Sequence, residues 1–538
     1  MTFADLLDRI GGVGTFQILH SLLLAFPVCM VACHNFLQNF TAAFPAHHCK
    51  QNPMLNVTEN ISYEDLLRAT IPLNQKGQPE RCQRFTEPHW MLLNPNATLG
   101  NISDVKTERC LDGWVYDTSI WDLVCDLSSM RQMAQSVYMV GVLLGGAVFG
   151  GIADRFGRRT VLIWSYMQMS VAGTLVAFLP SFPCYVFFRL ISGMTFSSVL
   201  LNTLLLEWMP VKGRTLAGTF IGYVFTCGQM VLSGLAYAIR DWRWLQFSVT
   251  VYDISTIESG RWLILNGRTD QALTNMRRVA RLNGMEAEGL KMTKEEVIAE
   301  MQHEISSRKS SHSLLDLVRT PGMRRITGCL MMVWFSTSFA YYGLAMDLQK
   351  FGISIYLVQF CFGAIDVPAK LVAALTMSYV GRRVTQGLFL VLAGTMIIAN
   401  IFVPVDMRAL RTALAALGKG CCASAFMCAY LYSGELFPTE IRQTGMGFSD
   451  MNARVGSVVA PVIHLIGEFI PILPALIFGS APIVSGIVAA SLLPETRNNP
   501  LSDTIQEVED RNWKKEVELK LEIVPLTQKP ENCFKDAI

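Results

Sequence analysis

The stretch Asp154-Arg155-Phe156-Gly157-Arg158-Arg159 stands between two long apolar runs and predicts a tight, basic turn. Glycine permits such a turn, and the Asp and Arg side chains can pair with the ends of neighbouring helices. A shorter copy, Gly381-Arg382-Arg383, follows an apolar run in the second half of the chain. The same motif at the same place in both halves predicts a fold built from two related halves.

The apolar runs around these motifs predict twelve membrane-spanning helices. In lipid every backbone amide must be satisfied within its own segment, so apolar runs of about 20 residues must be helical. A long polar interval separates six runs from six, and the chain is therefore expected to be an all-α polytopic membrane protein. The predicted spans are residues 16–36, 133–153, 160–180, 183–206, 216–239, 243–256, 326–346, 354–378, 384–404, 409–432, 444–469 and 471–493.

Composition supports this class and excludes others. Of the 538 residues, 51% are hydrophobic and only 16% are charged, whereas soluble domains carry about 25% charged residues. The formal net charge of +2 argues against a protein that binds nucleic acid through bulk charge. The sequence shows no nucleotide loop, metal-ligand cluster or nucleophile motif, so we expect no enzyme, no cofactor and no metal.

Basic residues in the short loops predict the orientation in the membrane. Lys and Arg are enriched in cytoplasmic loops, and they cluster here after the second, fourth, eighth and tenth spans. These loops then lie in the cytoplasm. The expected parts are a cytoplasmic N-terminus (1–14), an N-terminal six-helix half (15–257), a cytoplasmic loop (258–325), a C-terminal six-helix half (326–493) and a cytoplasmic tail (494–538).

The interval from about 40 to 130 is then extracellular, and its composition agrees. It carries four clustered glycosylation sequons, at Asn56, Asn60, Asn96 and Asn101. The same interval holds Cys49, Cys82, Cys110 and Cys125, an even number that suits a disulfide framework. Three pairings of four cysteines are possible, and the sequence does not choose among them.

Several motifs together resemble one family. The repeated basic turn is similar to that of the major facilitator superfamily. More specific are Asp112-Gly113-Trp114-Val115-Tyr116-Asp117 in the loop and Glu258-Ser259-Gly260-Arg261-Trp262 after the sixth span. Glu435-Leu436-Phe437-Pro438-Thr439 and Pro494-Glu495-Thr496-Arg497 complete the pattern. Over nearly its whole length the chain resembles the organic anion transporter branch of solute carrier family 22.

This resemblance implies a function. Members transport amphipathic organic anions across the plasma membrane by alternating access, and exchange against an intracellular dicarboxylate is expected. The fold then holds substrate between its two halves near the middle of the bilayer. The expected partners are small organic anions, a dicarboxylate and the lipid bilayer. An organic cation or zwitterion transporter remains the sibling alternative.

Two cations at membrane depth are the first candidates for binding an anion, because ionisable residues there are costly and mark function. Arg454 follows Asp450 by four residues, and Lys370 follows Asp366 by four. From spacing alone, each cation either attracts substrate or pairs with its neighbouring acid. The resemblance favours substrate contact for both, with Asp366 expected to hold or tune Lys370.

Aromatic and amide side chains form the second group of candidates. Aromatic residues in a membrane helix usually serve packing. The resemblance implies that some line the cavity, although Phe225 lacks the hydroxyl of the Tyr that the family commonly has there. Asn35 and Asn39 lie one turn apart on the first span. The candidates are Tyr223, Phe225, Trp334, Tyr341, Tyr342, Phe426, Tyr430, Asn35 and Asn39.

The sequence departs from the family pattern where it is short. Residues 116–121, the fourth span and the sixth span all appear shortened. The sixth runs only from Trp244 to Ile257, 14 residues that rise about 21 Å, against a hydrocarbon core of about 30 Å. A membrane protein that has lost transport is therefore a further alternative.

Overall fold

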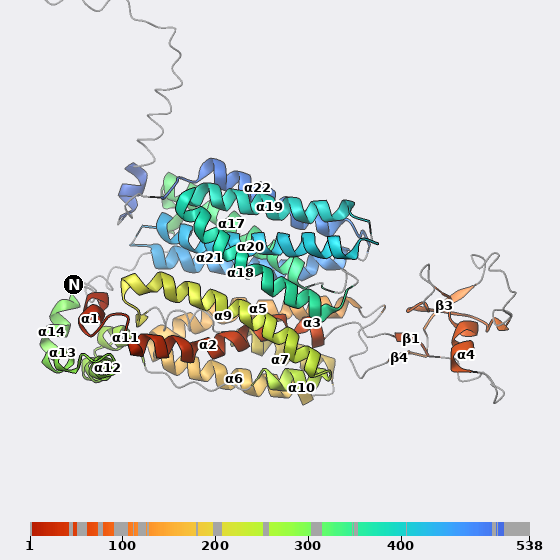
Figure 1. The fold of residues 1–538 in the computed structure, drawn as a ribbon, viewed down its shortest axis with the longest axis horizontal. Coiled ribbons are helices and arrows are strands. Elements are labelled where there is room, and N and C mark those ends of the chain that lie inside the picture. The colour runs from red at the N-terminus through yellow and green to blue at the C-terminus, as the bar shows by residue number, and fades with distance from the viewer. Residues whose placement is uncertain are drawn as a thin grey trace, which may run out of the picture.

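Two bundles of long helices lie side by side in the computed structural model of the chain (Figure 1). The all-α membrane fold predicted from the apolar runs is confirmed. The structure describes residues 3–41, 47–50, 62–73, 79–90, 106–110, 112–116, 125, 128–178, 181–196, 207–250, 258–302, 315–346, 348, 353–404, 406–438, 440–467, 469–497, 502 and 504–510.

The two bundles correspond to the two halves of the sequence. The N-terminal bundle contains α2 (Thr15–Phe36), α3 (Gln38–Thr41), α5 (Ser128–Phe156), α6 (Arg158–Phe178), α7 (Phe182–Met194), α9 (Val211–Ala238) and α10 (Trp242–Ser248). The C-terminal bundle contains α17 (Pro321–Ala345), α18 (Ile355–Tyr379), α19 (Arg382–Phe402), α20 (Arg408–Leu436), α21 (Arg442–Ile466) and α22 (Leu473–Leu492).

Eight helices of the described part of the chain are long and apolar enough to cross a membrane. They account for the first, second, third, fifth, eighth, ninth, tenth and twelfth predicted spans. Helices α17 and α21 have 25 residues each and are also long enough, but they are less apolar. The two halves meet where α5 packs on α21 and α9 packs on α18.

Glycines set the close approach of helices within each half. A Cβ on Gly141 or Gly145 of α5 would collide with backbone oxygens of α7. In the C-terminal half, Gly394 of α19 and Gly479 of α22 face each other in the same way. Small residues at these positions bring helix backbones into contact, which strengthens packing between apolar helices in lipid.

The described parts of the predicted fourth and sixth spans form α7 and α10. Helix α7 has 13 residues, and α10 has only seven before the chain turns at Val249 and Thr250. The remainder of both predicted spans, residues 197–206 and 251–257, lies outside the described residues.

A small unit, in the interval predicted to be extracellular, projects from one end of the bundle (Figure 1). It contains β1 (His47–Cys49) paired antiparallel with β4 (Trp114–Tyr116), β2 (Gln83–Phe85) paired with β3 (Thr107–Arg109), and α4 (Tyr63–Thr70). The pairing that the sequence left open is Cys49–Cys110 and Cys82–Cys125. The sequons at Asn56, Asn60, Asn96 and Asn101 lie outside the described residues.

Short helices gather at the opposite end, which the basic loops assign to the cytoplasm (Figure 1). They are α1 (Phe3–Arg9), α11 (Gly260–Leu265), α12 (Thr269–Leu282), α13 (Glu286–Lys291), α14 (Lys294–Glu300) and α16 (Asp316–Arg319). Arg9 forms ion pairs of 3.0 Å with both Glu296 and Glu300, which join α1 to the end of α14. The N-terminal segment is thus fastened to the loop between the halves.

Candidate functional site

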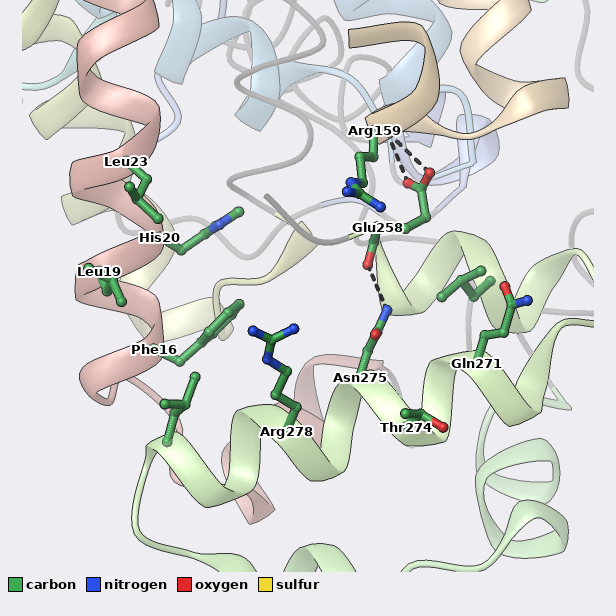
Figure 2. Close-up of a pocket in the computed structure, with 12 residues that line it drawn as sticks. Phe16, Leu19, His20, Leu23, Arg159, Glu258, Gln271, Thr274, Asn275 and Arg278 are labelled. Atoms are coloured by element: carbon green, nitrogen blue, oxygen red, sulfur yellow. Dashed lines mark hydrogen bonds between the residues drawn. The ribbon is translucent and has the colours of Figure 1, made fainter. Parts of the chain in front are cut away.

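The basic turn of the N-terminal half is held by a carboxylate from the segment after α10. Gly157 has a φ of +102°, a conformation that favours glycine. The Glu258 carboxylate accepts hydrogen bonds from the backbone N–H of Arg159, at 3.1 and 3.2 Å (Figure 2). Arg158 forms an ion pair of 3.2 Å with Glu207. The side chain of Asp154 lies outside the described part, and no partner of Arg155 is recorded among the described residues.

The C-terminal half repeats this arrangement residue by residue. Gly381 has a φ of +115°, and the Glu495 carboxylate accepts the backbone N–H groups of Arg382 and Arg383 at 2.8 and 3.0 Å. Arg382 forms an ion pair of 3.0 Å with Glu435. Partial burial raises the pKa of Glu495, but hydrogen bonds from four backbone N–H groups outweigh it and bring the pKa below its usual value. The predicted structural repeat is therefore present in the geometry.

Between the halves lies a continuous group of aromatic side chains. Phe36 of α2 packs against Phe225 of α9 and against Tyr341 and Tyr342 of α17, with ring centroids 6.3 to 6.4 Å apart. The group continues through Phe426 of α20, 5.6 Å from Tyr341. The sequence prediction named four of these five residues and missed Phe36.

The same group extends along α17 towards its N-terminal end. Trp334 contacts Phe426 and Tyr430, at 6.2 and 4.6 Å between ring centroids. Trp334 is fully buried and its indole N–H donates to the Ser433 hydroxyl at 2.8 Å, whereas Tyr430 is 48% exposed. Trp334 thus supports Tyr430 from behind, and Tyr430 offers the accessible surface.

Arg454 lies beside this aromatic group. Its Nη2 contacts the Asp450 Oδ1 at 3.3 Å, and the Asp450 carboxylate also accepts a 3.4 Å hydrogen bond from the Tyr430 hydroxyl. The guanidinium carbon lies 5.7 Å from the ring centroid of Phe196, on the N-terminal half. The pairing with Asp450 is therefore a single long contact. Arginine has five N–H donors, so most of them are left for another acceptor.

Lys370 makes its hydrogen bonds across to the other half rather than to Asp366, so the local ion pair that the spacing allowed is not the one in the structure. The Lys370 Nζ crosses to α9 and donates to the Gly222 carbonyl and the Thr226 hydroxyl, both at 2.7 Å, and it lies 5.9 Å from the ring centroid of Tyr223. Asp366 instead pairs with Lys419 of α20 at 2.8 Å. The physical reason is geometric: neighbouring helices bring Lys419 to the buried carboxylate, while Lys370 points to the other half.

Lys419 is the main residue that the sequence analysis missed. It is fully buried, donates to the Gln229 amide oxygen at 3.0 Å and to the Phe362 carbonyl at 2.7 Å, and lies 4.8 Å from the ring centroid of Tyr341. Gln229 in turn donates to the Tyr341 hydroxyl at 3.0 Å. The sequence did contain a signal for it: Lys419 stands in the middle of an apolar run, and burying a lysine charge in a membrane is costly.

Other polar contacts join the halves near the extracellular end. Asn35 donates to the Tyr342 hydroxyl at 2.9 Å, and Asn39 donates to the Ala345 carbonyl at 2.8 Å. Ser233 donates to the Tyr356 carbonyl at 2.5 Å, and the Tyr356 ring stacks on Phe40. Asn35 and Asn39 therefore hydrogen-bond the opposite half of the protein in this conformation.

Comparisons with known proteins agree with this geometry. Residues 73–507 match the family model described as "Sugar (and other) transporter". Over 562 aligned positions the chain is 53% identical to solute carrier family 22 member 20 of Mus musculus, with all of both chains covered. The chain belongs to solute carrier family 22.

Other relatives in solute carrier family 22 are similarly close. Member 6-A of Xenopus laevis is 48% identical with all of both chains covered, and organic anion transporter 3 of Oryctolagus cuniculus is 47% identical over 95% of this chain and 94% of its own. The 562 positions aligned with the mouse relative exceed the 538 residues here, so that relative carries at least 24 residues that this chain lacks.

Solved structures confirm the major facilitator fold. The xylose transporter XylE from E. coli in an inward-open conformation matches with a TM-score of 0.60, at 15% identity, over 92% of this chain and 99% of its own. A partially occluded inward-open form of XylE has a TM-score of 0.58. This chain is therefore a multi-pass membrane transporter of the major facilitator superfamily, and the family is one of transporters rather than enzymes.

Proposed function

We propose that this chain transports amphipathic organic anions across the plasma membrane by alternating access, in exchange for an intracellular dicarboxylate. The proposal rests on the position and contacts of Arg454. Its guanidinium lies between the halves beside an aromatic group, and its one recorded acid partner is held by a single 3.3 Å contact. A guanidinium with free donors offers forked hydrogen bonds to a carboxylate or sulfate.

The surrounding side chains suit the organic part of such a substrate. Phe426 is half-buried and Tyr430 is exposed, so both offer aromatic surface beside the buried rings of Phe36 and Tyr342, and such a mostly apolar lining suits pockets that accept varied ligands. Lys370 supplies a second positive charge, bonded to two neutral oxygens. The name of the Oryctolagus cuniculus relative, organic anion transporter 3, supports the same substrate class.

The contacts between the halves support an inward-facing state in the transport cycle. Asn39 with Ala345, and Ser233 and Phe40 with Tyr356, lie at the extracellular ends of their helices. Closure at that end leaves the cytoplasmic side as the entrance. In alternating access, the two halves rock and exchange which end is closed.

A transport-dead membrane protein is the second candidate, and the short sixth apolar run in the sequence favours it. Its 14 residues, from Trp244 to Ile257, rise about 21 Å, less than the hydrocarbon core of about 30 Å.

Uptake of carboxyfluorescein by expressing cells, normalised to surface-biotinylated protein, tests the proposal. We expect uptake above that of untransfected cells, a loss of at least tenfold in Arg454→Ala, and partial retention in Arg454→Lys, which keeps the charge but not the fork. Arg325→Ala is the matched control, because this exposed arginine lies on the cytoplasmic end of α17.

Each other outcome has a distinct meaning. Normal surface protein with no uptake of an anionic or a cationic dye would favour the transport-dead candidate. Uptake of a cationic dye alone would point to Asp450 and the cation alternative.

For the exchange step, preloading cells with glutarate should raise the rate of dye uptake at least twofold, and an unchanged rate would contradict dicarboxylate exchange.

A further inference from the structure

A pocket of about 610 Å³ lies at the cytoplasmic end of the N-terminal half, away from the aromatic group between the halves (Figure 2). One wall is the first two turns of α2. The opposite walls are the start of α6 and the cytoplasmic helices α11 and α12. None of the predicted substrate residues lines this pocket.

The α2 wall faces the lipid. Leu19 and Leu23 line the pocket and are 48% and 45% exposed. They belong to a stripe of exposed apolar residues that recurs every three to four positions along this spanning helix: Ile18, Leu19, Leu22, Leu23 and Phe26. Such a stripe on a membrane helix contacts acyl chains.

The opposite walls are basic. Figure 2 shows the Arg159 and Arg278 side chains directed from two elements towards the same space. Among the described residues, no acceptor is recorded for either guanidinium. Glu258, the acidic residue of the lining, is occupied by the backbone N–H groups of Arg159 and Ser259 at 3.0 to 3.2 Å. The pocket therefore holds two guanidinium groups against the single carboxylate of Glu258, beside an apolar wall.

Neutral polar groups fill the α12 side. Gln271, Thr274 and Asn275 line the pocket, and Gln271 and Thr274 are exposed. Amides and hydroxyls can both donate and accept hydrogen bonds, which suits a ring of hydroxyl groups better than a bare ion. The pocket thus offers polar side chains of α12 to hydroxyl groups, two guanidinium groups to phosphates and an apolar wall of α2 to acyl chains.

We propose that this pocket binds an inositol phospholipid of the cytoplasmic leaflet. Its phosphates lie between Arg159 and Arg278, its inositol ring contacts α12, and its acyl chains lie along Leu19 and Leu23. Basic pockets between membrane helices on the cytoplasmic side are suited to phosphorylated lipid head groups. A soluble phosphate would leave the exposed apolar wall without a partner. The site is independent of the proposed anion pathway.

Native mass spectrometry of the purified full-length chain tests this site. The detergent-solubilised protein is mixed with equimolar phosphatidylinositol 4-phosphate, phosphatidylserine and phosphatidylcholine, and the bound lipids are counted. We expect phosphatidylinositol 4-phosphate to be enriched, with at least a fivefold loss of binding in Arg278→Gln. Arg281→Gln is the matched control, since Arg281 lies on the same helix but pairs with Glu286 at 2.8 Å.

A second variant and a competitor complete the experiment. Gln271→Ala, at an exposed position, should lower the binding of phosphatidylinositol 4-phosphate two- to threefold. This variant tests the site even if Arg278→Gln elutes as an aggregate. Equal binding of the three lipids, or full retention in Arg278→Gln and Gln271→Ala, would overturn the proposal. Displacement of the lipid by equimolar soluble inositol 1,4-bisphosphate would overturn it too, because the site would then take a free phosphate.

Discussion

Glu258 and Glu495 occupy equivalent positions in the two halves. Each follows the sixth helical segment of its half, and each carboxylate accepts backbone N–H groups at the start of the helix that follows a positive-φ glycine. A carboxylate at a helix N-terminus is favoured by both hydrogen bonding and the helix dipole. The same arrangement, a carboxylate that accepts backbone N–H groups, therefore defines where the third and the ninth spans begin.

The first prediction concerns the charge of Glu495. Its pKa is below the usual value in the folded protein, so its contribution to stability is fully present above the ordinary carboxyl pKa. That contribution is lost as the pH falls through the folded-state pKa. We expect Glu495→Gln to melt at a lower temperature than wild type at pH 7, and this gap in melting temperature to narrow as the pH falls below the ordinary carboxyl pKa and through the folded-state value. A constant difference across this range, measured by thermal unfolding in detergent, would contradict the assignment.

The second prediction concerns the turn itself. Gly381→Ala places a Cβ 2.6 Å from a Glu495 carboxylate oxygen, on a backbone with a φ of +115°. At its ψ of +166°, this backbone conformation is essentially restricted to glycine and costs about 1–3 kcal/mol for a residue with a side chain, and the clash adds to it. Gly328→Ala, a helical glycine with open space around it, is the control and should be neutral or stabilising. Equal melting temperatures for the two variants would count against the strain argument.

The third prediction concerns the buried pair of Lys419 and Asp366. Removing one partner leaves an uncompensated buried charge, which costs about 3–5 kcal/mol. We expect Asp366→Leu and Lys419→Met each to reduce surface expression strongly, and the double variant to recover most of it. A double-mutant cycle on thermal stability measures the coupling, and simple additivity would show that the pair does not form.

The fourth prediction concerns the extracellular disulfides. Because Cys49 pairs with Cys110, the single variant Cys49→Ser and the double variant Cys49→Ser/Cys110→Ser should lose about the same stability. A bridge that closes a 61-residue loop is worth about 4 kcal/mol in the chain-entropy model. Cys49→Ser/Cys82→Ser breaks both bridges and should be more severe. Surface biotinylation of the three variants compares them, and the reverse order would indicate another connectivity.

The sequence predicted the parts of the structure that depend on local pattern. Apolar runs located the long helices because lipid leaves the backbone no alternative, and the repeated glycine-arginine turns revealed the two halves. The partner of Asp366 was missed because Lys419 is 53 residues away, whereas Lys370 offered a nearer pairing by spacing. Phe36 was missed for a similar reason: an aromatic residue in a membrane helix carries no mark of which neighbour it contacts.

The arrangement of buried charges has an electrical consequence. Asp366 and Lys419 lie on α18 and α20 of the same half, and Asp450 and Arg454 lie on one helix. When the halves rock, each pair moves as a neutral unit and displaces little net charge through the membrane potential. Lys370, bonded to the neutral oxygens of Gly222 and Thr226, is the exception among these cations. The voltage dependence of the cycle should therefore follow Lys370, the charge of the cargo and the buried Arg189 of α7, whose guanidinium lies over the Tyr138 ring.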